Sequence, residues 1–399
     1  MLRLLYILSL FLLAFSVFSA SGGKQKTVTP STYKLLQRAE KQIAAAAYSE
    51  AISKLKAGLA DLDAGSFDKA VVLRSMASAY SLKGEYKKAA RALEDSVATK
   101  ALPVDQQAEA RKNLGELYVA SGQYSKAVGH LESSISKAKS VTGEQYFMLA
   151  NAYAQLKKYK KAAPYMQKAI SRTAKPSEQW YRMLLALYYE SGNYKGGVNT
   201  LRKMIQTFPP KKDYWLQLIA MYRHMNQDSA ALAVNELAYK EGFITSPQEL
   251  TDLANMMSRA NLPYRSARLL EKEMQAGRLK RSSKNWEKVA NAWNQAKEFD
   301  RAAAALKKAS ALHSTGELSF RLGQIYIEQE NWKKAHAALL KAINKGGLSD
   351  PGTAQILFGL SCHELHFPDK ARQAFSRAQK YSNSRKTGRE WVNYLDSEG

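Results

Sequence analysis

One pattern of two paired helices recurs along nearly the whole chain of 399 residues. Each clear copy is marked by an aromatic residue that should open its second helix: Tyr48, Tyr86, Tyr124, Tyr159, Tyr194, Phe299 and Trp332. The first five markers are separated by 38, 38, 35 and 35 residues, and the last two by 33. Such a period is typical of helical hairpins stacked on one another. A stack grows through nearest-neighbour contacts, so the length of the chain does not by itself require several domains.

The third copy carries the pattern almost completely. Leu114 and Tyr118 are four residues apart and therefore lie on one helix face. Gly115 and Ala127 are small where the two helices should cross, and Gly122 suits a left-handed turn between them. These residues strongly resemble the tetratricopeptide-repeat family. The resemblance implies an all-α fold, a right-handed α-solenoid of about ten stacked hairpins.

Three copies depart from this pattern. The sixth has Asp228 in place of the aromatic marker, and the seventh and tenth have Pro263 and Pro368. Proline is tolerated at this position because an amide in the first turn has no partner within the helix. The tenth copy also has Cys362 where tyrosine is usual, which predicts a core-facing thiol. Because it is the only cysteine, no internal disulfide can form.

The two ends differ from the repeats. Arg3 precedes an apolar run and then small residues, which is typical of a secretory signal peptide, and the run is short for a membrane span. Thr387 and Glu390 have the spacing of a capping box before Trp391, Tyr394 and Leu395. We therefore expect a signal peptide at 1–21, a linker at 22–31, a solenoid at 32–383 and a capping helix at 384–399, with the mature protein in the periplasm.

The chain is strongly basic. It has 60 Lys and Arg against 35 Asp and Glu, a net charge of +25. In a cytosolic protein this charge would favour nucleic acid as the binding partner, but the pattern of a secretory signal peptide argues against it. Many lysines follow the aromatic marker directly, as at Lys87, Lys88, Lys160, Lys161, Lys333 and Lys334, where they should face outward. They either keep the surface soluble or attract anionic envelope polymers or an acidic partner.

The resemblance also implies where a partner binds, because in this family the concave groove is lined by first-helix residues outside the packing stripe. The mixture of aromatic, amide and charged side chains at these positions suits an extended or helical peptide. Lys112 is followed one turn later by Glu116, so the carboxylate clamp of some family members is not expected. The predicted groove residues are Arg74, Lys112, Glu116, Phe147, Asn151, Arg182, Tyr189, Arg223, Asn291, Asn294, Phe320 and Gln324.

Catalytic and metal-binding patterns are weak in this chain. Cys362, His363, Glu364 and His366 are the one cluster of metal-ligating residue types, but they should not converge, since Cys362 belongs to the core and His366 to a turn. The sequence has no nucleophile elbow, phosphate loop or zinc-protease helix. We therefore expect a protein without enzymatic activity, metal or cofactor.

Three stretches resemble a narrower group, exported bacterial tetratricopeptide-repeat proteins associated with the TonB energy-transduction system. They are "AVVLRSMASAYSLKGEYKKAARALEDSVATKALP", "QWYRMLLALYYESGNYKGGVNTLRKMIQTFPPKKDYWLQLIAMY" and the closing "REWVNYLDSEG". The resemblance implies a periplasmic scaffold that binds TonB or its proton-channel complex and supports uptake of iron chelates or similar nutrients. The alternative is a module associated with peptidoglycan or another glycan, in envelope assembly or polysaccharide export.

Overall fold

The computed structural model describes residues 26–138 and 140–398, and every regular element within them is an α-helix. The predicted signal peptide and the first part of the predicted linker, residues 22–25, lie outside the described residues. The first described helix begins at Pro30, with Thr29 as its N-cap. None of the described helices is both long and apolar enough to cross a bilayer.

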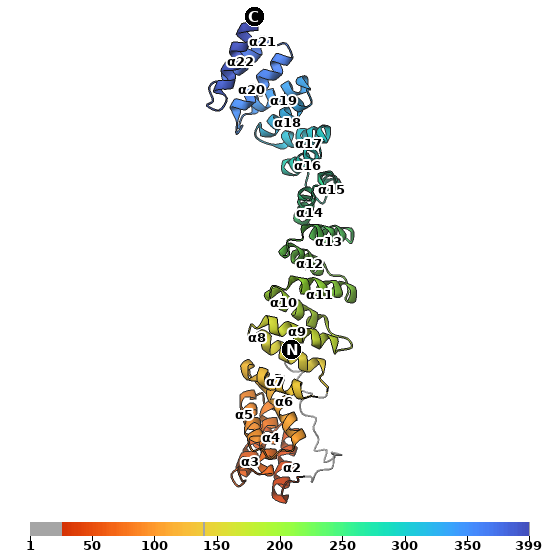
Figure 1. The fold of residues 1–399 in the computed structure, drawn as a ribbon, viewed down its shortest axis with the longest axis vertical. Coiled ribbons are helices and arrows are strands. Elements are labelled where there is room, and N and C mark those ends of the chain that lie inside the picture. The colour runs from red at the N-terminus through yellow and green to blue at the C-terminus, as the bar shows by residue number, and fades with distance from the viewer. Residues whose placement is uncertain (1–25, 139, 399) are drawn as a thin grey trace. The chain divides into compact units, whose positions relative to one another are not determined.

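The chain divides after Phe208 into two compact units. In the first unit the described helices form five hairpins, each packed on the next (Figure 1). Their helices are α2 (Pro30–Ala44), α3 (Tyr48–Leu59), α4 (Phe67–Leu82), α5 (Tyr86–Ala98), α6 (Val104–Ala120), α7 (Tyr124–Lys137), α8 (Gly143–Gln155), α9 (Tyr159–Ser171), α10 (Glu178–Glu190) and α11 (Tyr194–Thr207).

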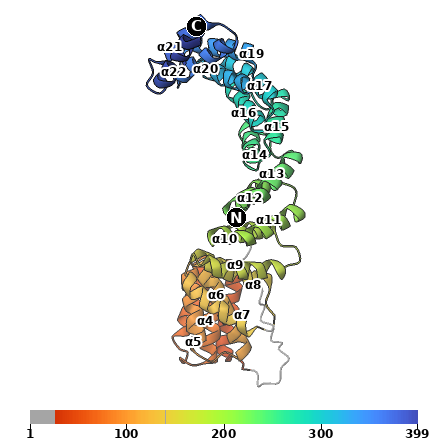
Figure 2. The same ribbon diagram turned by 45° about the horizontal axis from the view of Figure 1, so that its top comes forward.

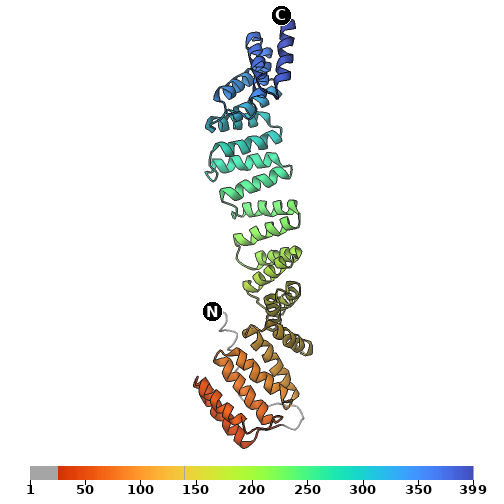
Figure 3. The ribbon, with the colours of Figure 1, turned by 90° about the vertical axis from the view of Figure 1, so that its left-hand side faces the viewer.

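The second unit contains five further hairpins and one additional helix. Figure 3 shows several of these helices stacked one after another. They are α12 (Lys212–His224), α13 (Asp228–Lys240), α14 (Pro247–Arg259), α15 (Pro263–Gln275), α16 (Ser283–Gln295), α17 (Phe299–Leu312), α18 (Glu317–Glu328), α19 (Trp332–Lys345), α20 (Pro351–Glu364), α21 (Pro368–Ala378) and α22 (Arg385–Glu398). The predicted fold of about ten stacked hairpins is confirmed.

Each of the seven aromatic markers is the first residue of a second helix, as predicted from the period. Asp228, Pro263 and Pro368 open the second helices of the three irregular hairpins in the same way. The marker therefore identifies the second helix of every hairpin, even where the residue is no longer aromatic.

The turn before each second helix uses one left-handed residue, two positions ahead of the helix. Glycine fills it at Gly84, Gly122 and Gly192, with φ between +72° and +84°. The other seven hairpins place a residue with a side chain there, at φ between +53° and +60°: Ala46, Lys157, Asn226, Asn261, Lys297, Glu330 and His366. Residues with a Cβ pay a conformational cost at such angles, so these seven turns carry local strain that the glycine turns avoid.

Helix crossings are close because small residues lie between them. A Cβ built on Gly115 would come within 2.7 Å of the Leu131 side chain, and Ala127 is fully buried. A Cβ built on Gly323 would come within 2.6 Å of the Leu339 side chain. The predicted role of small residues at these crossings is confirmed.

The last helix covers the end of the second unit. Figure 2 shows α22 beside α20 and α21, and Trp391 of α22 stacks on Phe375 of α21 with ring centroids 5.1 Å apart. The predicted capping box is wrong, because α22 begins at Arg385 and Thr387 already lies inside the helix. The apolar face of Trp391 and Leu395 outweighs the capping signal in positioning this segment.

Candidate binding surfaces

The first helices of neighbouring hairpins contact one another through their side chains in the first unit. Arg74 of α4 donates a hydrogen bond to Gln106 of α6 at 2.8 Å and pairs with Glu109 at 3.5 Å. Phe147 of α8 stacks on Trp180 of α10 with ring centroids 5.0 Å apart. These contacts join first helices into a surface on which a partner could touch several hairpins.

The other predicted groove residues of this unit are partly or largely accessible. Lys112 and Asn151 are half-buried, whereas Arg182 is exposed and pairs with Glu178 at 2.7 Å. Tyr189 is 48% exposed and lies edge-on to Tyr194. The surface therefore offers one large exposed aromatic side chain together with charged and amide groups.

Glu116 is the one carboxylate among the predicted groove residues, and it is half-buried. Burial raises its pKa above the ordinary value of 4.5, although Lys112, one turn earlier, acts in the opposite direction. Glu116 and Lys112 thus place an acidic group beside a cation on one helix. A carboxylate clamp would instead present cations to the carboxylate of a partner.

In the second unit the predicted residues fall into two groups. Arg223, Asn291 and Asn294 are exposed, and Gln324 is half-buried. Asn291 accepts a hydrogen bond from Arg321 of the next first helix. Phe320 does not fit the groove prediction, because it is only 7% exposed and packs with Leu339 and Ala354 in the core. Its position in the first turn of α18 turns the ring toward the next hairpin.

An aromatic ring at the end of five first helices lies beneath a cation. In each case the cation is eight residues after the ring and belongs to the second helix of the same hairpin. The distances to the ring centroids run from 4.7 to 5.9 Å: Tyr80 with Lys88, Tyr118 with Lys126, Tyr153 with Lys161, Trp293 with Arg301, and Tyr326 with Lys334. The outward-facing lysines predicted from the sequence are exposed, but one of each pair also packs on an aromatic ring.

Three of these rings also donate a hydrogen bond to a glutamate on the second helix of the preceding hairpin. The pairs are Tyr118 with Glu94, Tyr153 with Glu132, and Trp293 with Glu271. Each glutamate is the ninth residue of its helix. The ring thus links two hairpins, with a carboxylate at its polar end and a cation over its face, and we call this arrangement the ring triad.

The fifth hairpin keeps the ring of Tyr188 but neither charged partner of the ring triad. Gly196 occupies the position of the cation, and Gln167, the ninth residue of α9, occupies that of the glutamate. A Cβ on Gly196 would meet the Tyr188 ring at 2.7 Å, so the ring packs directly against the backbone of α11. Within the described residues, no protein group accepts a hydrogen bond from the Tyr188 hydroxyl, and burial raises the pKa of this group.

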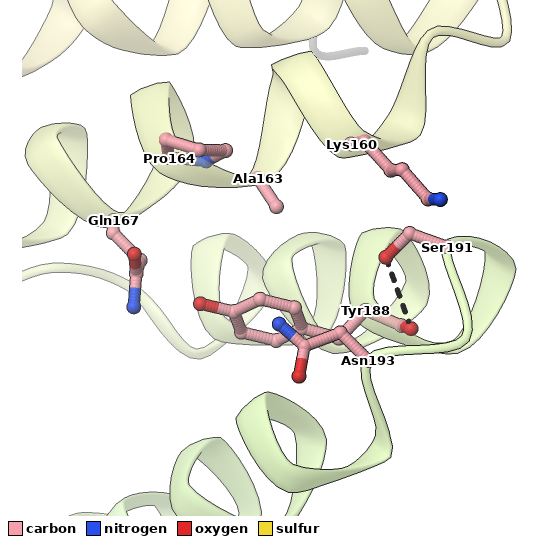
Figure 4. A pocket seen from close by; sticks show the side chains of 7 residues that line it. All are labelled: Lys160, Ala163, Pro164, Gln167, Tyr188, Ser191 and Asn193. Carbon is pink, nitrogen blue, oxygen red and sulfur yellow. Dashed lines mark hydrogen bonds between the residues drawn. The ribbon is translucent and has the colours of Figure 1, made fainter.

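A cavity of about 310 Å³ lies between α9 and the ring of Tyr188 (Figure 4). Figure 4 shows Ala163, Pro164 and Gln167 above the ring, with Lys160 at one side. Pro164 lies inside α9 and removes one backbone donor from that helix. The complete lining is Lys160, Ala163, Pro164, Gln167, Tyr188, Ser191 and Asn193, with no carboxylate among them.

A wider groove of about 560 Å³ adjoins this cavity and shares Pro164 and Gln167 with it. Apolar side chains form its floor and two further lysines lie in its lining. Its remaining residues are Lys168, Ile170, Ser171, Tyr181, Leu184, Gly196, Asn199, Thr200 and Lys203. Together the two hollows form a basic surface lined by α9, α10 and α11, and none of the predicted first-helix groove residues lines it. We call it the α9–α11 groove.

The cluster around the cysteine is a packing arrangement. Cys362 is buried as predicted, and its Sγ lies 3.5 Å from Nδ1 of His336. Burial raises the pKa of the thiol to about 11. His363 lies against Trp391 instead of turning toward the sulfur. In the described part of the chain no three residues among His, Cys, Asp and Glu form a group suited to a metal ion.

The α9–α11 groove was not predicted from the sequence. Its signal lies in the alignment of the repeats, because glycine and glutamine stand in the fifth copy where other copies carry a cation and a carboxylate. Reading each copy for its packing residues alone hides that difference, since Tyr188 itself follows the pattern.

Comparison with solved structures gives many matches of low sequence identity. A tetratricopeptide-repeat protein from Parabacteroides merdae is 15% identical, over 75% of this chain and all of its own, with a TM-score of 0.38. MamA is 20% identical over 43% of this chain and 97% of its own, with a TM-score of 0.34. YrrB, described as a tetratricopeptide-repeat protein with an unusual peptide-binding site, is 18% identical over 49% and 91%, with a TM-score of 0.35.

No match was found among curated protein sequences. Models of the tetratricopeptide repeat match residues 110–143, 144–176 and 287–349. The first two stretches contain the ring and the cation of two ring triads, and the third covers most of the hairpins of α16–α17 and α18–α19. Residues 110–176 and 287–349 therefore contain tetratricopeptide repeats, and the hairpins of both units repeat the same arrangement of two helices.

Proposed function

We propose that this protein is a scaffold without enzymatic activity that binds protein partners through its first-helix surfaces. The observation that carries the proposal is the side-chain contact between successive first helices, Arg74 with Gln106 and Phe147 with Trp180, which joins the first helices of neighbouring hairpins. Extended or helical peptides are recognised by surfaces of this kind, because affinity accumulates over many small contacts.

We further propose that the protein is periplasmic and acts as an accessory component of TonB-dependent energy transduction. The signal-like pattern at residues 1–21 supports export. The three stretches quoted above support the link to TonB, whose complex would then be the partner in uptake of iron chelates or similar nutrients. The role is one of binding and positioning, with no chemical step on this chain.

The second candidate function is association with peptidoglycan or another anionic glycan in envelope assembly or polysaccharide export. The net charge of +25 and the exposed lysines of the second helices favour it. Binding of this type would weaken steeply with salt, since exposed charges more than about 10 Å apart are screened at 0.1 M salt.

Capture from solubilised bacterial envelope separates the two candidates. The full chain is expressed in the bacterium with a C-terminal affinity tag, purified, and the retained proteins are identified by mass spectrometry, while cosedimentation with purified sacculi measures glycan binding. Retention of TonB or its channel proteins supports the first candidate. Sedimentation with sacculi and no retained envelope protein would overturn it in favour of the second.

Paired variants locate the surface used. Asn151→Ala with Tyr189→Ala alters the first-helix surface of the first unit, and Arg223→Ala with Asn294→Ala does so in the second. Lys54→Ala with Lys87→Ala, both on second helices, is the control. Loss of the partner with either first-helix pair but not with the control supports the proposed surface, whereas full retention with both pairs rejects it.

A further inference from the structure

We propose that the α9–α11 groove binds an acidic segment of a partner protein and places one carboxylate of that segment beside Tyr188. This site is lined by α9, α10 and α11 and contains none of the residues of the first-helix surface proposed above. The ligand would supply the carboxylate that three other hairpins supply from within the fold.

The ring triads show which group the ring of Tyr188 lacks. In three hairpins a buried ring donates its hydrogen bond to a glutamate, as Tyr153 does to Glu132. At Tyr188 the corresponding residue is Gln167, and within the described residues no protein group accepts from the hydroxyl. An approaching carboxylate can accept this hydrogen bond, and a hydrogen bond to a charged group is stronger than one between neutral groups.

The charge of the groove favours an anionic ligand. Lys160 lines the cavity, and Lys168 and Lys203 line the adjoining groove, whereas neither lining contains an aspartate or glutamate. Lys168 also lies over the rings of Tyr146 and Tyr165, while Lys160 and Lys203 are exposed lysines at the edge of the groove. A cation placed here would meet like charges, whereas an anion would meet cations and neutral polar groups but no carboxylate of the lining.

The apolar floor of the groove favours a protein segment as the ligand over a polyanion that has no apolar side chains. Pro164 is exposed and Ile170 is half-buried in the groove, but Tyr181 and Tyr188 are only 7% and 5% exposed, so their rings are not open platforms for stacking sugars. Apolar side chains flanking an acidic residue would cover this floor, whereas a carboxylated polysaccharide would leave it exposed to water. Charge and shape together favour an acidic peptide with alternating apolar residues.

The test uses a fluorescent peptide of alternating glutamate and leucine, the same peptide with glutamine for glutamate, and polygalacturonate as a carboxylated polymer without apolar side chains. Binding to the full chain is followed by fluorescence anisotropy. We expect the acidic peptide to bind, and both the glutamine peptide and polygalacturonate to bind at least about tenfold more weakly.

Gln167→Glu is the decisive variant, because it installs the carboxylate of the ring triad in the empty position. It should raise the melting temperature and weaken binding of the acidic peptide about tenfold. Gln37→Glu, at an exposed position of α2, makes the same change of charge elsewhere and should leave binding unchanged. Lys160→Gln should weaken binding, whereas Lys87→Gln, an exposed lysine of α5, should not.

Equal binding of the acidic peptide to wild type and Gln167→Glu would overturn the proposal, as would equal binding of the acidic and glutamine peptides. If polygalacturonate binds as tightly as the acidic peptide and depends equally on Gln167, the groove is a glycan site and the proposal is wrong. None of these outcomes depends on the first-helix surface, so this inference and the scaffold proposal can fail separately.

Discussion

The ammonium group of Lys334 lies 5.6 Å from the centre of the Tyr326 ring, eight residues earlier in the same hairpin. Lys333, directly before it, is also exposed but has no aromatic ring beneath it in the described structure. The two neighbouring lysines thus differ in their surroundings although both face solvent. The basic surface of this protein therefore includes lysines that stabilise the hairpins as well as lysines that contribute only charge.

Replacing Lys334 by methionine should lower the free energy of unfolding by about 0.5 to 1 kcal/mol, because methionine keeps most of the aliphatic stem but loses the cation over the ring. Lys333→Met should change it by less than about 0.5 kcal/mol. Both values are measured by urea denaturation followed by circular dichroism. Equal losses for the two variants would mean that the cation over Tyr326 contributes nothing measurable.

Gly122→Ala should lower the free energy of unfolding by about 1 kcal/mol. A Cβ at Gly122 would have open space around it, so the cost comes from φ of +75° alone. Gly129 is the matched control, because its Cβ would also meet nothing within 4 Å but the residue lies inside α7. Gly129→Ala should therefore stabilise the protein by about 0.5 to 1 kcal/mol. Thermal unfolding shifts of the same sign for both would contradict this account.

The repeat period made the fold predictable from the sequence. The aromatic marker opens the second helix in seven of the ten described hairpins, so Tyr124 or Trp332 predicts a helix start. The regular spacing locates the other three second helices, which begin with aspartate or proline. Glycine at position 122 likewise predicted the left-handed turn, but Lys297 and Glu330 hold the same conformation without any sequence signal. There the packing of the flanking helices overrides the intrinsic preference of the residue.

The candidate sites were less predictable. Phe320 was expected in the groove from its place on a first helix, but the first turn of α18 packs on α19 and α20 and buries it. The cavity at Tyr188 depends on what Gly196 and Gln167 lack compared with other hairpins. A repeat pattern is recognised by the residues that match it. It therefore does not detect a site that forms because two charged residues of the pattern are replaced.

Glu116→Gln should raise the free energy of unfolding at pH 7. Burial raises the pKa of Glu116 in the folded protein above 4.5, so the folded state binds the proton more tightly than the unfolded state. The charged carboxylate therefore costs stability as the pH rises through the folded pKa, and the neutral amide avoids that cost. Below pH 4.5 the two proteins should converge. Urea denaturation at pH 4 and pH 7 measures the difference, and a gain at pH 4 that vanishes at pH 7 would reverse the assignment.

Glu249→Gln should act in the opposite direction, lowering the free energy of unfolding at pH 7 by about 1 kcal/mol. Burial opposes ionisation of this group, but hydrogen bonds from Lys212 at 2.9 Å and from the Ser246 backbone N–H at 3.1 Å lower its pKa to about 2. The ionised Glu249 side chain therefore contributes fully to the free energy of unfolding above pH 4.5, and this contribution is lost as the pH falls toward 2. The deficit of the variant should shrink over that interval, and a deficit independent of pH would point to lost packing instead.

Cys362 provides a direct test of the end of the second unit. It is the only cysteine, it is fully buried, and Trp391 of α22 packs with it and with Phe375 in one cluster. A thiol reagent should therefore modify it only when the last hairpin opens. Trp391→Ala removes a large part of the cover and should speed modification about tenfold or more, since roughly 1.4 kcal/mol of local stability corresponds to a factor of ten. Lys386→Ala, at an 83% exposed side chain of the same helix, should leave the rate unchanged. Rapid modification of the unaltered protein would instead mean that α22 does not protect the hairpin of α20 and α21.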